Sequence, residues 1–250
     1  MAGHSKWAGI KHKKAIVDAR RGKLFTKLAR AITVAAKEGG GDVDGNPSLA
    51  LAVQKAKDAS MPKDNIERAI AKGTGEGSDA DALETVLYEG YGPGGVAILM
   101  ETLTDNRNRT VGEIRHILTK WAGNLGAANS VARLFSKRSV ISIAKEKASE
   151  ETLMEALLEA GADDLRDDGA AWEIVSAPEH HAAVVEAVKK LGIEPDNAEV
   201  AMVPSDYIKL EGKQAQQMLK LMEALEDHDD TKNVWSNFDV DEKEIEASLA

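Results

Sequence analysis

The first thirty residues combine basic side chains with an aromatic ring, a mixture suited to binding a polyanion. Residues 1–30 contain nine lysines and arginines but a single acid, Asp18. Basic side chains neutralise phosphates and release the counterions condensed on a nucleic acid, whatever its base sequence. The candidates for phosphate contact are Lys6, Lys11, His12, Lys13, Lys14, Arg20, Arg21, Lys23 and Lys27. We predict that this basic arm binds a nucleic acid rather than forming only a solvated chain end.

The tryptophan among these basic residues has two alternative roles. Trp7 can stack on an exposed base, which single-stranded or looped RNA offers. It can instead pack with Ile10 against the helices that follow, because most tryptophan surface is buried in proteins. Trp7 is therefore a candidate binding residue whose role the sequence leaves open.

A second basic feature occurs in the segment "LTDNRNRTVGEIRH", where Arg107 and Arg109 precede a predicted helix. Thr110 and Glu113 have the spacing of a capping box, which predicts that the helix begins there. Guanidinium groups on a loop at this position can clamp phosphates through paired hydrogen bonds. The alternative is a surface loop whose arginines form salt bridges with acids such as Asp105. Both alternatives stay open at the level of sequence.

The remaining charges and the composition exclude several classes of protein. Residues 146–250 hold nine bases and 27 acids, so that part of the chain repels nucleic acid. The chain has no cysteine, which rules out disulfides and thiolate nucleophiles and fits a reducing compartment. No apolar run follows the basic N-terminus as in a secretory signal, and none approaches the length of a membrane span. We expect a cytoplasmic protein with no membrane partner.

Two short motifs resemble functional sites without meeting their structural requirements. Gly90, Gly92 and Gly95 match the dinucleotide motif G-x-G-x-x-G, but an apolar β-branched run follows instead of a helix, so we predict a turn. The segment "EDHDD" around His228 offers oxygen ligands for a divalent cation. It lacks the glycine-turned loop of such sites, so we favour a solvated helix end.

Sequence motifs of common enzyme classes are absent. The chain has no phosphate-binding loop, no zinc-protease motif and no nucleophile elbow. We predict no catalytic residues, no metal, no cofactor and no enzymatic activity. The alternative is an enzyme that uses a cleft between domains.

The hydrophobic pattern predicts an α+β protein with three domains. Helical spacing and helix-start signals recur in "GKLFTKLARAITVAAKEGGG", "GNPSLALAVQKAKDAS" and "MPKDNIERAIAKG", of which the second begins with Asn46 as N-cap and Pro47. A strand–strand–helix–strand–strand unit follows, and a helix and a strand near the C-terminus complete it. Between these parts, helices alternate with strands as in ferredoxin-like folds. We predict that both α/β domains are ferredoxin-like and that the middle one is discontinuous.

The predicted domain boundaries follow from this pattern. They are 1–78 for the basic arm and a three-helix domain, 79–145 plus 212–250 for a discontinuous first α+β domain, and 146–211 for an inserted second one.

Five segments together resemble the YebC/PmpR family across nearly the whole chain. They are "MAGHSKWAGIKHKKAIVDARRGKLFTKL", "NPSLALAVQKAKDASMPKDNIERAI", "YEGYGPGGVAILMETLTDNRNRT", "GNLGAANSVARLF" and "LEDHDDTKNVWSNFDV". The resemblance implies a helical N-terminal domain and two α/β domains around a cleft. It brings no catalytic residues. Gly9 departs from the commoner asparagine of the family's opening, which loosens the helix there but keeps the charges.

The resemblance implies control of gene expression through a nucleic acid. Members of the family are described as transcriptional regulators that bind DNA, which favours that function. The family also includes the mitochondrial translational activator of cytochrome oxidase, so the alternative is a ribosome-associated translation factor that binds rRNA. A basic arm without a groove-reading helix suits the irregular surface of RNA. The expected partner is therefore DNA or rRNA, with the ribosome as a further partner under the alternative, and the oligomeric state is not indicated.

Overall fold

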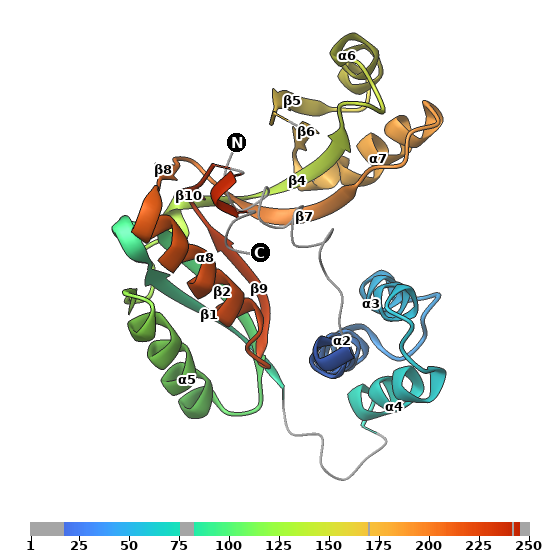
Figure 1. Ribbon diagram of the computed structural model, residues 1–250. Coiled ribbons are helices and arrows are strands. Elements are labelled where there is room, and N and C mark those ends of the chain that lie inside the picture. The colour runs from blue at the N-terminus through green and yellow to red at the C-terminus, as the bar shows by residue number, and fades with distance from the viewer. Residues whose placement is uncertain (1–17, 76–82, 170, 242, 246–250) are drawn as a thin grey trace.

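The computed structural model describes residues 18–75, 83–169, 171–241 and 243–245, and the side chains of residues 18–21 and 158 lie outside that description. Figure 1 shows a helical domain in blue, a middle domain in green and red, and an inserted domain in yellow and orange. The predicted α+β class is confirmed: three N-terminal helices precede two antiparallel sheets that each carry helices.

The helical domain consists of three helices, and a buried N-cap residue sets the start of the second one. The helices are α2 (Asp18–Gly39), α3 (Pro47–Asp58) and α4 (Lys63–Gly73). The Asn46 side chain accepts a hydrogen bond from the Leu49 amide at 3.1 Å and donates one to the Ala35 carbonyl at 2.8 Å. The predicted N-cap is confirmed, and it also ties α3 to α2.

Helices α2 and α4 approach each other closely near Thr33. The Thr33 hydroxyl lies 2.9 Å from the carbonyl oxygen of Ala29 and 3.1 Å from that of Ala69, so it links the two helices. A Cβ on Gly73 would lie 2.4 Å from the Thr33 carbonyl oxygen. Only glycine allows this approach, so α2 and α4 pack directly against each other.

The middle domain is a four-stranded sheet with the order β3-β1-β2-β9. Its strands are β1 (Glu84–Tyr91), β2 (Ala97–Thr104), β3 (Asn124–Leu125) and β9 (Thr231–Ser236). Helices α5 (Arg107–Lys120) and α8 (Gly212–Glu226) lie side by side on one face in Figure 1. That face buries Ile98 and Met100, whereas Leu99 points to the opposite face. The C-terminal segment thus returns to pair with β2, so the sheet of this domain includes a strand from the end of the chain.

The glycine-rich motif forms the turn of a hairpin. Strands β1 and β2 pair in antiparallel fashion, and the short 3-10 helix η1 (Pro93–Gly95) joins them. Gly94 has a φ of 71°, in the left-handed region that favours glycine. A Cβ on Gly92 would lie 2.8 Å from the Met218 sulfur, so the turn packs tightly against α8. The predicted turn is confirmed.

The inserted domain has the ferredoxin-like order of elements. Its sheet order is β5-β6-β4-β7, and one helix follows the first strand while another precedes the last. The elements are β4 (Phe135–Ala144), α6 (Glu150–Leu158), β5 (Ala162–Asp167), β6 (Ala171–Ser176), η3 (Pro178–His180), α7 (His181–Lys190) and β7 (Asn197–Pro204). A pair of short parallel strands, β8 (Ile208–Lys209) and β10 (Phe238–Asp239), joins the returning chain to the C-terminal segment.

Strand β4 lies in a different sheet from the one expected. The last two strands of the predicted strand–strand–helix–strand–strand unit fall in residues 130–145, which the sequence pattern places in the middle domain. The structure has the 3-10 helix η2 (Ala132–Leu134) followed by β4, which pairs with β6 and β7. An alternating apolar pattern predicts a strand but not its partner. The pairing favours a domain boundary just before Phe135 rather than at residue 145.

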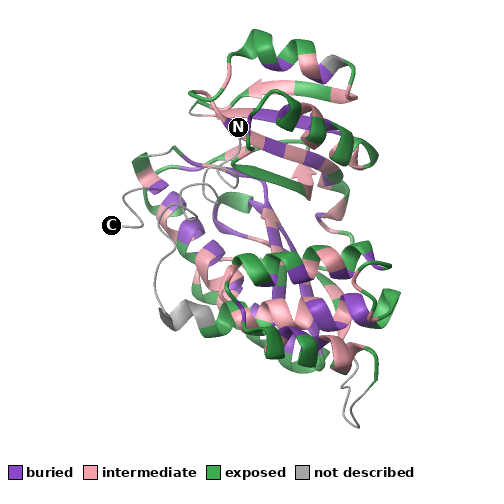
Figure 2. Cartoon of the chain, turned by 90° about the vertical axis from the view of Figure 1, so that its right-hand side faces the viewer, coloured by how far each residue is buried: buried purple, intermediate pink, exposed green. Residues whose placement is uncertain are grey.

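Each domain has its own core, and a further apolar cluster joins the two sheets. Figure 2 shows buried residues along the inward faces of helices and strands. The cluster between the sheets includes Leu99 of β2, Phe135 of β4 and the half-buried Trp235 of β9. Among the described helices, none has the length and apolar character that a bilayer span requires.

Candidate nucleic-acid interface

Most of the predicted arm falls outside the described part of the chain. Lys6, Trp7, Lys11, His12, Lys13 and Lys14 precede the described residues, and the side chains of Arg20 and Arg21 are also outside them. Lys23 is exposed on α2. Lys27, one turn further on, donates a hydrogen bond to the carbonyl oxygen of Glu226 at the end of α8. A cation is favoured there because the carboxyl end of a helix carries partial negative charge.

Arg30 joins the helical domain to the middle domain, although we had not included it among the candidates. Its guanidinium donates a hydrogen bond to the Asp229 carbonyl at 2.8 Å and another to the Asp230 carboxylate. Lys27 and Arg30 are three residues apart on α2, so both side chains lie on the same face of the helix and contact the middle domain where α8 ends. The sequence contains no signal for this contact, because the partners are 200 residues apart.

Asp230 is the centre of this junction. Its side chain is only 2% exposed and accepts hydrogen bonds from the Thr110 hydroxyl at 2.6 Å and from Arg109 at 2.9 Å, in addition to Arg30. Burial alone would raise the pKa of Asp230, but the bonds from Thr110, Arg109 and Arg30 lower it to about 2. The carboxylate is therefore ionised at neutral pH and holds two arginines from different domains.

Arg107 and Arg109 lie in the first turn of α5 rather than in a loop before it. The helix begins at Arg107, and the Asn106 side chain caps it by accepting a hydrogen bond from the Arg109 amide at 3.1 Å. The predicted start at Thr110 is wrong, because Thr110 is buried against Asp230 and an earlier asparagine provides the cap. Cations are disfavoured at the amino end of a helix, so nearby carboxylates are needed to balance them.

Both arginines are paired with those carboxylates. Arg107 donates two hydrogen bonds to Glu84, at 2.5 Å and 2.6 Å, and these bonds lower the pKa of the Glu84 carboxyl group. Arg109 contacts Asp105 at 2.8 Å as well as Asp230. This geometry favours the salt-bridge alternative, since a phosphate would have to compete with acids already in place. Their contact with a nucleic acid stays a prediction.

The "EDHDD" segment is not the solvated helix end that we expected. The His228 side chain is 8% exposed, and its Nε2 atom lies 2.9 Å from the Glu113 carboxylate. The amide of Asp230 donates to His228 Nδ1 at 3.2 Å. The segment is partly buried because α8 ends at Glu226 and β9 begins at Thr231, which draws the turn between them against α5.

Among the described residues, one group could offer ligands to a metal ion. It consists of Glu113, His228 and Asp230. One ligand atom from each lies within 4.8 Å of the others. The two histidine nitrogens and the two Asp230 oxygens already take part in hydrogen bonds within the protein. A cation would have to replace these bonds and would lie beside the guanidinium of Arg109. The arrangement therefore fits a network of hydrogen bonds within the protein better than a metal site.

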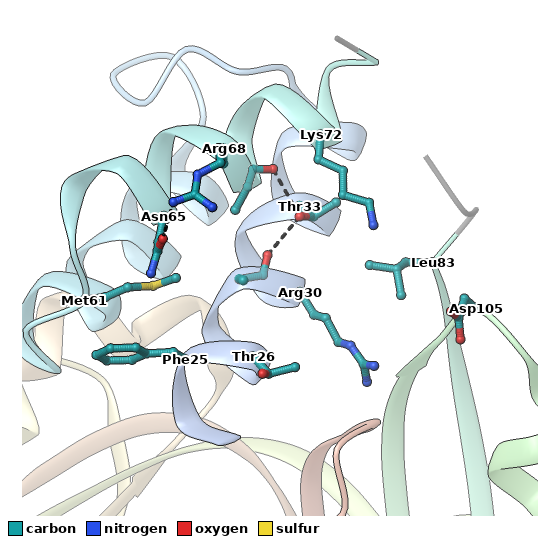
Figure 3. A pocket seen from close by; sticks show the side chains of 12 residues that line it. Phe25, Thr26, Arg30, Thr33, Met61, Asn65, Arg68, Lys72, Leu83 and Asp105 are labelled. Atoms are coloured by element: carbon teal, nitrogen blue, oxygen red, sulfur yellow. Dashed lines mark hydrogen bonds between the residues drawn. The ribbon is translucent and has the colours of Figure 1, made fainter. Parts of the chain in front are cut away.

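A cleft between the helical and middle domains is a second candidate site that sequence reasoning missed. It has a volume of about 450 Å³, and its walls come from α2, α4 and the segments next to β1 and β2. Figure 3 shows Arg30, Arg68 and Lys72 around it, with Asp105 across from them. The lining residues are Phe25, Thr26, Ala29, Arg30, Thr33, Met61, Asn65, Arg68, Ala69, Lys72, Leu83 and Asp105. Arg68 and Lys72 are four residues apart, a spacing that predicts one shared helix face, and this pattern could have pointed to the cleft from the sequence.

The sequence matches known proteins over its whole length. Residues 5–76 match the "TACO1/YebC protein N-terminal domain", and residues 83–238 match the "TACO1/YebC second and third domain". A protein of Rubrobacter xylanophilus is 52% identical over 250 residues, covering 100% of both chains. A protein of Acidobacterium capsulatum is 55% identical over 244 residues, covering 98% of both chains. Each of these two relatives is named "Probable transcriptional regulatory protein".

The fold also matches a solved structure. The crystal structure of a conserved hypothetical protein from Aquifex aeolicus superimposes with a TM-score of 0.78 at 43% sequence identity. The match covers 91% of this chain and 93% of the other. With both domain matches and full-length relatives above 50% identity, the chain belongs to the TACO1/YebC family.

Proposed function

We propose that this protein is a cytoplasmic, DNA-binding regulator of transcription. The observation that carries the proposal is the concentration of basic residues in one small domain, while the last 105 residues hold 27 acids and nine bases. The relatives named as transcriptional regulatory proteins support the same function. The basic domain would meet the phosphate backbone, and the acidic part would remain on the side away from it.

The residues proposed for contact divide into two groups. Lys6, Lys11, Lys13, Lys14, Arg20, Arg21 and Lys23 form the first group, with Trp7 and His12 among them. In the second group, Lys27, Arg107 and Arg109 already have partners within the protein. We expect the first group to supply most of the binding free energy, because the second must exchange existing bonds for phosphate.

A ribosome-associated translation factor that binds rRNA is the second candidate function. The cleft described above favours it, because Phe25 lines it together with Arg68 and Lys72, and unpaired bases stack on aromatic rings. Ribosomal RNA offers many unpaired segments, whereas duplex DNA keeps its bases stacked inside.

The salt dependence of binding tests the proposal. The triple variant Lys11→Gln/Lys13→Gln/Lys14→Gln removes three charges from the arm. Each lost phosphate contact reduces the log–log salt slope on duplex DNA by about 0.9, so we expect a total reduction of up to about 2.7. Fluorescence anisotropy with a labelled duplex at several salt concentrations measures the slope.

The matched control removes three lysines from the acidic part, as Lys189→Gln/Lys190→Gln/Lys213→Gln, and we expect its slope to stay at the wild-type value. An arm variant with an unchanged slope would remove the basis of the proposal. Repeating the titration with an rRNA fragment, and sedimenting lysates with and without nuclease, separates the two functions. Tighter binding to rRNA together with co-migration with ribosomes would favour the translation factor over the transcriptional regulator.

A further inference from the structure

We propose that the cleft between the helical and middle domains binds an unpaired nucleotide within a single-stranded nucleic acid. Arg68 and Lys72 would hold its phosphates, and Phe25 with Met61 would contact its base. This inference rests on the part of the proposed function that both candidates share, the binding of a nucleic acid, because it names a second contact site and the form of nucleic acid that the site accepts.

Arg68 is held in position, and within the described residues it forms no ion pair. Its Nε atom donates to the Asp64 carbonyl at 3.2 Å and its Nη2 atom to the Asn65 side-chain oxygen at 2.7 Å. Both acceptors are uncharged, so the guanidinium keeps its full positive charge. A guanidinium has five N–H donors, and these two bonds leave enough of them to grip a phosphate through two oxygens.

Lys72 adds a second charge beside Arg68. The two residues are four apart on α4, which places their side chains on the same face of the helix, and Figure 3 shows the Lys72 ammonium directed toward Leu83 across the cleft. Within the described residues, Lys72 forms no ion pair, whereas Lys63 on the same helix pairs with Glu67. Two like charges at this spacing repel, and a bound anion relieves the repulsion.

The other end of the cleft is apolar. Figure 3 shows the Phe25 ring beside Met61, with Asn65 between this pair and Arg68. Phe25 is half-buried and Met61 is 7% exposed, so the ring lies at the surface of the core with one part open to the cleft. A flat aromatic surface in the same cleft as two phosphate ligands matches a base and its own backbone.

The size and the remaining charges of the cleft agree with this occupant. A volume of about 450 Å³ is within the range of pockets that hold small organic ligands the size of a nucleotide. Arg30 is already bonded to Asp230, and Asp105 is an acid on the opposite wall. Among the described residues that line the cleft, the positive charge without an ion-pair partner is therefore on the α4 side, which directs the phosphate toward Arg68 and Lys72. A paired base could not leave its duplex to reach Phe25 without a cost in stacking.

Binding of a labelled single strand by charge variants tests this site. The probe is a fluorescein-labelled oligouridine 12-mer, compared with a labelled DNA duplex, and the variant is Arg68→Gln/Lys72→Gln. Each phosphate contact on a single strand contributes about 0.7 to the salt slope, so we expect the slope to fall by about 1.4. The matched control, Lys57→Gln/Lys63→Gln, removes two exposed charges from the same domain outside the cleft, and we expect it to change the slope by less than half as much.

The base contact is tested by Phe25→Leu, which keeps an apolar side chain but loses the aromatic face. We expect it to bind the 12-mer about tenfold more weakly with an unchanged salt slope. Thermal unfolding of each variant by circular dichroism confirms that the helical domain still folds. Equal effects of Phe25→Leu on the single strand and the duplex would overturn the stacking role.

The outcomes separate this site from the proposed function. If the cleft variant matches its control on the 12-mer while the arm variant still weakens binding, the cleft proposal is wrong and the function stands. If the cleft variant lowers binding to duplex and single strand equally, the selection of an unpaired strand is wrong. Absence of nucleic-acid binding by the unmodified protein would overturn both.

Discussion

The middle domain meets its two neighbours through different kinds of interaction. Toward the helical domain, the junction consists of Lys27 and Arg30 bonded to the end of α8 and to Asp230. Toward the inserted domain, it consists of an apolar cluster that includes Leu99 and Phe135. Charged contacts between partly exposed groups weaken in salt, whereas burial of apolar surface does not. We therefore expect the helical domain to be the more easily displaced of the two.

The two junctions also use their buried carboxylates differently. Glu89, which is 6% exposed, accepts hydrogen bonds from the backbone amides of Asn129, Val131 and Ala132 at 2.6 to 2.8 Å. These donors are close together in one connecting segment, so Glu89 fixes the path of the chain into the inserted domain. Asp230 instead receives donors from two domains. The comparison shows that a buried acid can shape a segment in one place and hold two domains together in another.

The largest expected effect is at the apolar junction. Phe135→Ala should lower the free energy of unfolding by about 4 kcal/mol, because it leaves a cavity between the two sheets. Urea-induced unfolding measures the change. Leu87→Ala is the control, since Leu87 is 50% exposed and should lose less than about 1 kcal/mol. Similar losses in both variants would mean that this cluster does not couple the sheets.

The polar junction should respond to the loss of its acceptor. Asp230→Ala leaves Arg30, Arg109 and Thr110 without their carboxylate, and we expect a loss of about 3 kcal/mol in low salt, with less of a loss in high salt. Asp229→Ala is the matched control, because only the backbone carbonyl of Asp229 contacts Arg30 and its side chain is exposed. Limited proteolysis of both variants reports whether the helical domain separates. Equal behaviour of the two variants would contradict the role of Asp230.

The same residue should also make stability depend on pH, and this effect is expected to be smaller. The pKa of Asp230 is about 2 in the folded protein, below the usual 3.8. Its contribution is therefore present above pH 3.8 and is lost as the pH falls toward 2. Acid titration of the unfolding midpoint should show this loss in the wild-type protein and not in Asp230→Ala.

Glu173 provides the opposite pH response near the apolar junction. Burial and the negative charge of Asp168 raise the pKa of Glu173 to about 7, from the usual 4.5. Its folded state holds a proton that the unfolded chain releases, so stability should fall as the pH rises from 4.5 to 7 and stay level above that. We expect a difference of about 2 kcal/mol between pH 5 and pH 8.

The variant Glu173→Gln should remove this slope, because an amide does not titrate. Glu199→Gln is the control, since Glu199 lines the same small cavity but is exposed. Urea-induced unfolding at several pH values measures both. A slope that persists in Glu173→Gln would show that another group is responsible.

Local features of the fold could be predicted from the sequence because they depend on neighbouring residues. Asn46 and Pro47 begin a helix through contacts within a single turn, and Gly94 permits the hairpin turn through its own backbone angles. The start of α5 was placed three residues late because two cap signals, Asn106 and Thr110, stand close together. Only the packing of Thr110 against Asp230 decides between them.

The sequence does not predict which strands pair with each other or which charged side chains form salt bridges. The alternating pattern in residues 135–144 predicts a strand, but its pairing with β6 and β7 depends on elements that come later in the chain. Of the acids paired with Arg107 and Arg109, only Asp105 could be anticipated, because it lies four residues before Arg109 in the sequence. Glu84 and Asp230 are brought in by the sheet.

Positive charge is concentrated near the N-terminus and negative charge near the C-terminus, and this follows from the amino-acid sequence alone. The class of the fold follows from the sequence as well, through periodic patterns that each helix and strand carries within itself. The tertiary structure settles which basic side chains are neutralised: Arg30 is paired with Asp230, whereas within the described part of the chain Arg68 bonds to uncharged oxygens. An ionic interaction depends on distance in space, and salt screens it beyond about 10 Å, whatever the separation along the chain.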